Sequence, residues 1–204
     1  MKKLLLLLLL FSFIKAHAQD EAGLFFAQNY STFRFVDSND NKDDLNYTIG
    51  FGYGALYQKA IGDFMFLRAD LLYNKLGATS QEGIEKLDWE LHYAGVDAFF
   101  GLKMDLGRLK PYAQAGLYYS YLLKADQHIG VLYYDLIKED LLNKSDFGLK
   151  VSAGVSYQYS NEGNVFISIN QDWGLWELEK SDDNQNMYNR NFSIQIGLRF
   201  SIVE

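Results

Sequence analysis

Residues 189–204, at the end of the sequence, alternate between apolar and polar side chains along their length. A period of two places successive side chains on opposite faces of a β-strand, so this segment predicts a strand with one apolar and one polar face. Similar alternation occurs at 22–36, 47–58, 63–75, 87–104, 111–124, 146–159 and from about 164 to 175. The sequence therefore predicts eight strands, longer than the roughly 5 or 6 residues that are usual in soluble proteins.

The connections between these segments alternate in length. Four are long, at 37–46, 76–86, 125–145 and 179–188, and three are short, at 60–63, 105–110 and 160–163. In an up-and-down arrangement, the four long loops lie at one end and the three short turns at the other. Outer-membrane barrels show this asymmetry, and an even number of strands closes into a ring without an exposed edge.

The apolar rows face either a protein core or lipid, and the opposite rows decide between these two media. The opposite rows are rich in glycine and poor in charge, whereas the outside of a soluble barrel carries many more Lys and Glu side chains. Small and polar residues suit the narrow interior of an eight-stranded barrel. We therefore predict an all-β fold: an eight-stranded antiparallel up-and-down transmembrane β-barrel with its apolar face outward and a polar, filled interior. A soluble β-barrel or sandwich is the alternative.

Aromatic side chains lie toward the ends of several apolar rows. Aromatic residues gather at the two membrane–water interfaces of membrane barrels, where their rings contact both media. The predicted aromatic girdle consists of Tyr47, Tyr57, Tyr157, Tyr159, Trp173, Phe192 and Phe200.

The segment 87–104 departs from simple alternation. Its apolar row runs from Trp89 to Tyr93 and then changes parity at Val96. We interpret this change as a β-bulge at Ala94-Gly95, because a bulge inserts one residue and often uses glycine.

The first 18 residues have the pattern of a cleaved secretory signal peptide. Lys2 and Lys3 precede an apolar stretch at 4–14, and a small-x-small site ends at Ala18, before Gln19. The predicted domains are therefore the signal peptide at 1–18 and the barrel at 19–204. No second run of about 18 apolar residues follows, so a membrane location requires a β-barrel.

The amino-acid composition limits which partners and which cellular location are expected. The chain has no cysteine, so it has neither a disulfide framework nor a lipid-modified N-terminal cysteine. Its 19 basic residues are scattered among 26 acidic ones, which argues against nucleic acid as a partner. We expect the cell outer membrane as the location, with outer-membrane lipid, lipopolysaccharide and the barrel-assembly machinery as partners.

Five charged residues fall on rows that we expect to face the interior: Arg68, Asp70, Lys150, Asp172 and Arg199. Buried charges persist when they are paired, so we predict an interior polar network of ion pairs and hydrogen bonds that plugs the lumen. For Arg199 the expected partner is Asp70 or Asp172. A narrow conduction path is the alternative.

Catalytic and metal-binding patterns are weak. After the predicted signal, the histidines are His92 and His128, and no spacing links either one to a particular serine or acid, so we predict no enzymatic activity. The acidic stretch 37–44 lacks the glycine and the final glutamate of a calcium loop. We interpret it as a solvated loop, bridged loosely by divalent ions to lipopolysaccharide, and predict no metal site and no cofactor.

Four stretches, at 70–77, 91–123, 145–159 and 189–200, resemble the PorT-like outer-membrane β-barrel proteins of gram-negative bacteria in order and spacing. Asp97 is a departure, because similar proteins usually carry proline there.

The resemblance implies a small outer-membrane barrel without an assigned catalytic activity. A structural or interaction role with four long extracellular loops is the first hypothesis, with an envelope protein as a further partner. A subunit of an outer-membrane secretion or gliding machine is the second, since the founding member of the family is linked to one. A soluble periplasmic ligand carrier is the third.

Overall fold

The computed structural model describes residues 20–37, 42–82, 85–130, 132–180 and 185–202. The predicted signal peptide and its cleavage site lie outside the described residues, as does the middle of the acidic stretch 37–44. The strands are β1 Asp20–Asp37, β2 Lys42–Asp44, β3 Asn46–Ile61, β4 Met65–Glu82, β5 Glu85–Lys103, β6 Leu109–Ile129, β7 Leu132–Asp135, β8 Ser145–Gln158, β9 Gly163–Gly174 and β10 Gln185–Ile202. No helix in these ranges is long and apolar enough to cross a membrane.

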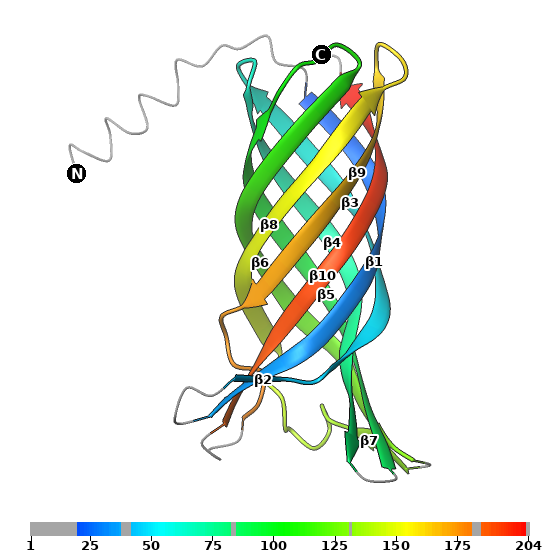
Figure 1. The fold of residues 1–204 in the computed structure, drawn as a ribbon, viewed down its shortest axis with the longest axis vertical. Coiled ribbons are helices and arrows are strands. Elements are labelled where there is room, and N and C mark those ends of the chain that lie inside the picture. Colours follow the sequence, from blue (N-terminus) through cyan, green and yellow to red (C-terminus); the bar gives the residue numbers. More distant parts are fainter. Residues whose placement is uncertain (1–19, 38–41, 83–84, 131, 181–184, 203–204) are drawn as a thin grey trace, which may run out of the picture.

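Eight long strands form one closed antiparallel ring (Figure 1). Their order around the ring is β10, β9, β8, β6, β5, β4, β3 and β1, and β1 pairs with β10 from Asp20↔Ile202 to Asp37↔Gln185. Every long strand therefore has a hydrogen-bonded neighbour on both sides, which satisfies the backbone polar groups. The predicted eight-stranded up-and-down barrel is confirmed.

The two ends of the barrel differ. Three short turns, at 62–64, 104–108 and 159–162, lie at the same end as Asp20 and Ile202, and we call this the turn end (Figure 1). The opposite end carries β2 and β7 and is the hairpin end.

Two of the four predicted long loops are wrong, one almost wholly and one in part. Residues 76–82 and 85–86 belong to β4 and β5, which stay paired from Met65↔Leu102 to Glu82↔Glu85. Within 125–145, β6 continues to Ile129 and pairs with β7. The alternation of apolar and polar residues stops near residue 75 because the surroundings of the strands change there, not because the strand ends.

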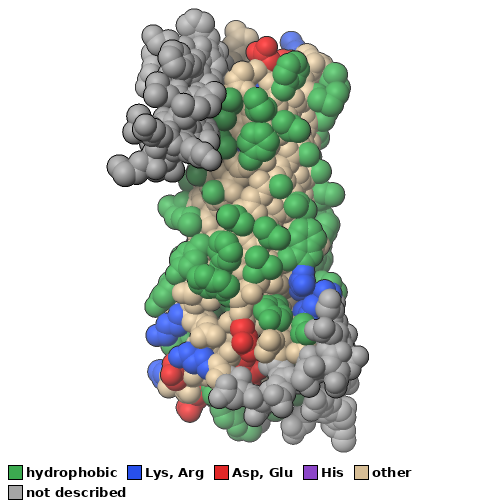
Figure 2. Space-filling model, turned by 90° about the vertical axis from the view of Figure 1, so that its left-hand side faces the viewer, with side chains coloured by type: hydrophobic (Ala, Val, Ile, Leu, Met, Phe, Trp, Pro, Cys, Tyr) green, Lys and Arg blue, Asp and Glu red, His purple; other side chains and the backbone are tan. Residues whose placement is uncertain are grey.

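The outward side chains of the ring are mostly apolar and exposed over its middle. Leu71, Ile169 and Ile196, for example, are more than half exposed. Figure 2 shows apolar side chains spread over the middle of the barrel and charged side chains gathered toward its ends. The apolar rows therefore face outward, as predicted, and a soluble barrel with an apolar core is excluded for this part of the molecule.

The polarity of the two faces inverts toward the hairpin end. On β5, Phe99 and Asp97 point inward and so do Tyr93 and Leu91, with no change of parity between them. On the outer face the residues in this part are polar: Lys75 pairs with Glu90, and Thr79 donates a hydrogen bond to Asp88. The outside has thus changed from lipid to water, and the inside from a mixture of polar and aromatic side chains to mainly apolar ones.

The predicted bulge at Ala94-Gly95 is therefore wrong. The apolar residues up to Tyr93 belong to an interior core, and those from Val96 onward belong to the lipid-facing surface. A bulge does occur nearby, on β6: His92 pairs with Lys124 but Tyr93 pairs with Leu122, so Leu123 is the extra residue. The change from lipid to water outside β5 therefore produces the same shift of the apolar residues in the sequence as a bulge would.

We expect the loss of stability caused by a charge on the outer face to depend on whether its position faces lipid or water. Ile196→Lys, at the middle of β10, should reduce the free energy of unfolding in lipid vesicles by about 2–4 kcal/mol, as for lysine at a bilayer midplane. Asn186→Lys is the matched control, because Asn186 is an exposed residue of the same strand at the hairpin end. It should cost less than about 1 kcal/mol. Equal costs, measured by urea titration, would contradict the assignment of the lipid band.

Candidate functional site: the barrel interior

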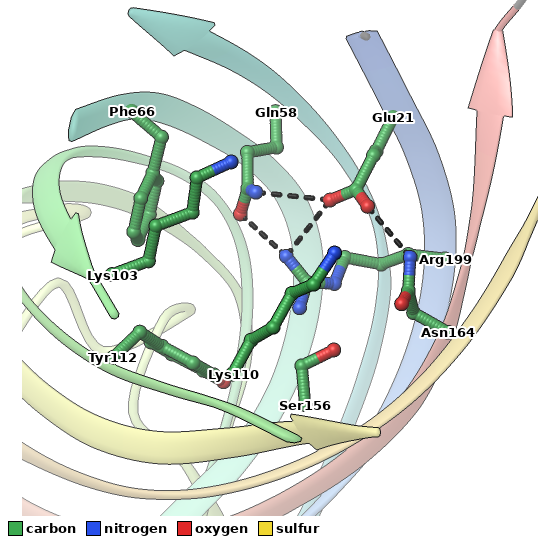
Figure 3. A pocket seen from close by; sticks show the side chains of 9 residues that line it. All are labelled: Glu21, Gln58, Phe66, Lys103, Lys110, Tyr112, Ser156, Asn164 and Arg199. Atoms are coloured by element: carbon green, nitrogen blue, oxygen red, sulfur yellow. Dashed lines mark hydrogen bonds and ion pairs between the residues drawn. The ribbon is translucent and has the colours of Figure 1, made fainter. Parts of the chain in front are cut away.

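The turn end is closed by an ion pair between the first and last strands (Figure 3). The Nη1 atom of Arg199 donates to Glu21 Oε2 at 3.0 Å and to Gln58 Oε1 at 2.7 Å. Gln58 and Asn164 also donate to the Glu21 carboxylate, at 2.9 and 2.7 Å. The partner predicted for Arg199 is therefore wrong. Glu21 occupies that role because closure of the ring brings β1 beside β10.

A second ion pair lies deeper in the lumen. Arg68 binds Asp70 in a bidentate manner, with Nε–Oδ1 and Nη2–Oδ2 distances of 2.7 and 2.8 Å. The guanidinium also lies 5.2–5.9 Å from the ring centroids of Phe25, Phe99 and Phe166. Both charged groups are almost fully buried, so the pairing and the aromatic faces replace the water that they lose.

The third charged group is centred on Lys150. Its Nζ atom lies 2.8 Å from Asp97 Oδ2 and 3.6 Å from Asp172 Oδ2. Asn191 donates to Asp172 at 3.0 Å. Asp97, noted in the sequence only as a departure from a related family, is thus a buried partner of Lys150.

A buried carboxylate, Asp146, lies beyond this group toward the hairpin end. Tyr118 and Asn189 donate to its Oδ2 atom at 3.1 and 2.7 Å, and Asn189 also donates to the hydroxyl of Tyr93 at 3.2 Å. Asp146 has no ion-pair partner among the described residues.

The five residues predicted for the interior network all point inward, but they belong to three ion-paired groups, of which those of Arg68 and Lys150 adjoin because Asp70 pairs with Asp97 between β4 and β5. Arg68 forms an ion pair with Asp70, and Lys150 forms one with Asp172. Arg199 pairs with Glu21 and with neither of these two aspartates. Sequence reasoning missed the other members, which are Glu21, Gln58, Asp97, Asp146, Asn189 and Asn191. The sequence could have indicated them, because each lies an even number of residues from other inward-facing residues of its strand.

The side chains leave little space in the polar lumen. Cavities of about 30 Å³ beside Arg199 and about 10 Å³ beside Asp146 are the size of a few waters and of one water. Glycines make this filling possible: a Cβ on Gly101 would lie 2.1 Å from Cζ of Phe66, whose ring occupies that space. The lumen in this part of the barrel is a packed core of polar, charged and aromatic side chains.

The interior becomes apolar at the hairpin end, and we call this part the apolar head. Phe33, Leu91, Leu122, Leu178 and Met187 are among its buried residues, which come from the strands and from the connections after β7 and β9. Backbone hydrogen bonds fix those connections: Leu136 N donates to Ala125 O at 2.9 Å, and Leu178 N donates to Met187 O at 2.9 Å. The head therefore has a core of its own.

The connections of the head are also linked by charge. Lys180 Nζ lies 2.5 Å from Asp140 Oδ1, which joins the connection after β7 to the one after β9. This hydrogen bond lowers the pKa of the Asp140 carboxyl. A carboxylate with a lowered pKa contributes stability above its ordinary pKa and loses that contribution as the pH falls, so acid weakens this link.

The predicted girdle residues lie on the outer face. Tyr57, Tyr157, Tyr159 and Phe200 are exposed near the turn end, where Ala22 of β1 pairs with both Tyr57 and Phe200. Trp173, Phe192 and Tyr47 lie farther toward the hairpin end, and the ring of Phe192 lies 6.1 Å from that of Tyr30. The structure thus places them in two groups along the barrel.

Neither histidine lies in a catalytic arrangement of serine and acid. His92 is on the outer face, where its Nε2 atom lies 2.7 Å from Glu90 and its ring contacts Tyr73. The ring of His128 lies 5.3 Å from that of Tyr133. In the part of the chain that the structure describes, no three acidic or histidine side chains are grouped to hold a metal ion.

The closed ring, the apolar outer band and the filled polar lumen define a small membrane-spanning β-barrel. The family model of the outer membrane protein beta-barrel domain matches residues 17–178, so the chain belongs to this family and is an outer-membrane barrel protein. No curated protein matches the chain.

Two solved structures illustrate the shared fold. OprG from Pseudomonas aeruginosa has a TM-score of 0.57 at 10% identity, over 92% of this chain and 97% of its own. Neisserial surface protein A has a TM-score of 0.51 at 17% identity, over 88% of this chain and 97% of its own. At these identities the likeness shows the fold alone.

The ion pair at the turn end predicts a large effect of one substitution. Arg199→Leu leaves the carboxylate of Glu21, whose side chain is 17% exposed, without its cation. Loss of one partner of a buried pair costs about 3–5 kcal/mol, so the variant should lose that much unfolding free energy in a urea titration.

Two further variants control this measurement. Lys180→Leu removes a partner of the exposed pair with Asp140 and should change the unfolding free energy little, because water and salt screen an exposed pair. Adding Glu21→Gln to Arg199→Leu should restore part of the stability, because no unpaired charge remains. An Arg199→Leu variant as stable as Lys180→Leu would show that the pair does not hold the turn end closed.

Proposed function

We propose that this protein is a non-conducting interaction barrel whose apolar head and hairpins bind a partner outside the lipid. The observation that carries this proposal is the inversion of polarity on β5 and its neighbours. The ring continues past the lipid band as a folded unit with its own apolar core and with charged pairs on its outer surface, such as Lys75–Glu90. A barrel that served only as a membrane anchor would need no such extension.

The filled lumen supports a role without conduction. Three groups of charged residues and a buried cluster that includes Phe25, Phe66 and Phe166 fill the interior, and the cavities beside the charged groups hold a few waters at most. The alternative of a narrow conduction path would require these groups to move apart.

The hairpin end, in this proposal, faces the outside of the cell and the turn end faces the periplasm, since outer-membrane barrels have short periplasmic turns. Export through a signal peptide cleaved after Ala18 belongs to the same proposal, as do insertion by the barrel-assembly machinery and contact with lipopolysaccharide. The mass of the mature protein should then correspond to a chain that begins at Gln19.

Site-specific photocrosslinking in living cells tests the interaction role. A photoreactive phenylalanine at Tyr134, an exposed residue of β7, should form a specific adduct with a partner. The matched position is Arg108, which is exposed in a turn at the opposite end. We expect no specific adduct there.

The opposite pattern supports a different function. Adducts at Arg108 but not at Tyr134, together with reduced protein secretion in a deletion strain, would replace the display role with that of a secretion-machine subunit, which the PorT-like resemblance implies. Adducts at neither position would contradict both roles.

A further inference from the structure

The apolar head contains a cavity that the interaction role does not require. Its volume is about 160 Å³, several times that of the cavities in the polar lumen. The wall includes Phe33, Trp89, Leu136, Leu142 and Met187, which come from β1, β5, β10 and the connection after β7. The polar residues of the wall are Gln127 and Glu179.

The wall belongs to a well-packed core. Phe33, Leu91 and Leu136 are at most 4% exposed, so the inner wall of the cavity is held in place on several sides, while the half-exposed Leu141 also lines it and the cavity is partly open to solvent. In another protein, an engineered cavity of about 150 Å³ lined by Leu, Ile and Phe binds benzene. The cavity in the head has a similar volume and a mostly apolar lining, so its wall offers water few hydrogen-bond partners.

The aromatic residues of the wall indicate which apolar molecules fit. The rings of Phe33 and Trp89 meet edge to face, with centroids 6.2 Å apart. Aromatic rings prefer offset-stacked and edge-to-face neighbours, so this wall favours a flat aromatic guest over a saturated one of the same size. With a single carboxylate and no basic residue in the wall, an anion gains no ion pair there.

We propose that this cavity binds a small uncharged aromatic molecule of about the size of benzene. The binding site lies beyond the lipid band, in the apolar head that the interaction role also uses. Its test uses the purified protein and an added probe, so it gives a result whether or not a partner binds the head.

The methionines provide an internal control for this test. Met187 lines the cavity, whereas Met65 and Met104 are exposed on the outside of the barrel near the turn end. With methyl-labelled methionine and the full mature chain in lipid nanodiscs, fluorobenzene should shift the Met187 signal in a saturable manner. The signals of Met65 and Met104 should change only in proportion to the fluorobenzene dissolved in the lipid.

Two filling variants from different elements locate the site. Leu142→Trp and Leu91→Phe both add volume to the wall, so each should weaken fluorobenzene binding at least 10-fold. Leu132→Trp is the control, because Leu132 is an exposed residue of β7 and adds its ring outside the cavity. It should bind like the natural chain. If a filling variant fails to fold, the Met187 titration of the natural chain still decides the question.

Three results would overturn the proposal. The first is a Met187 signal that changes in proportion to the signals of Met65 and Met104, which reports partition into lipid only. The second is unchanged binding in a folded filling variant, which places the site elsewhere. The third is equal affinity for cyclohexane, which removes the aromatic selectivity.

Discussion

The structure depends on the medium that each face of each strand meets. In lipid, every backbone N–H and C=O group needs a partner within the protein, and an antiparallel ring closed by β1 and β10 gives each long strand a neighbour on both sides. Once the ring is closed, the side chains must match lipid on one face and a narrow lumen on the other. Where the ring leaves the lipid, near Lys75 and Glu90, the same two faces exchange their polarity. One continuous barrel thus has two cores, one in which ion pairs and polar side chains pack with aromatic rings and one that is mainly apolar.

Burying charged groups in the lumen is energetically unfavourable, and this limits which residues can lie there. A charge in the lumen is removed from water, and removing its partner is more damaging than replacing the pair. Arg68, Lys150 and Arg199 each have a carboxylate within 3.0 Å, and each comes from a different strand. Lys150 on β8 reaches across β6 to Asp97 on β5, and Arg199 links the neighbouring strands β10 and β1, whereas Arg68 and Asp70 lie on the same strand. These pairs fill the interior, and the two that join different strands also help to fix the register of the ring. The filled lumen and the apolar head together favour a protein that presents a surface over one that conducts solutes.

Much of the fold was predictable because lipid imposes a simple alternation. The rows of β3, β8 and β10 mark their strands clearly, and their outward direction follows from the glycines and small polar residues opposite them. The alternation misled at 76–86 and at 89–96, where the outside changes from lipid to water. If the whole outer face is assumed to contact lipid, such a change is interpreted as a loop or a bulge.

The candidate site was predictable only in part. That Arg199 would point inward follows from the phase of its strand, but its partner Glu21 is 178 residues away in the sequence. Only the closing register places them together. The cavity near Met187 could not be predicted either, because it depends on how the connections after β7 and β9 fold over the head.

The inversion of polarity along β5 can be measured directly, since the chain has no cysteine and single cysteines can be introduced for spin labels. Labels at successive positions from 88 to 100, in lipid vesicles, report access of oxygen from the lipid and of a nickel chelate from water. We expect odd positions to be shielded from both reagents throughout. Even positions should change from nickel access at 88 and 90 to oxygen access from 96 to 100. A switch of the shielded positions from odd to even near residue 94 would contradict the account.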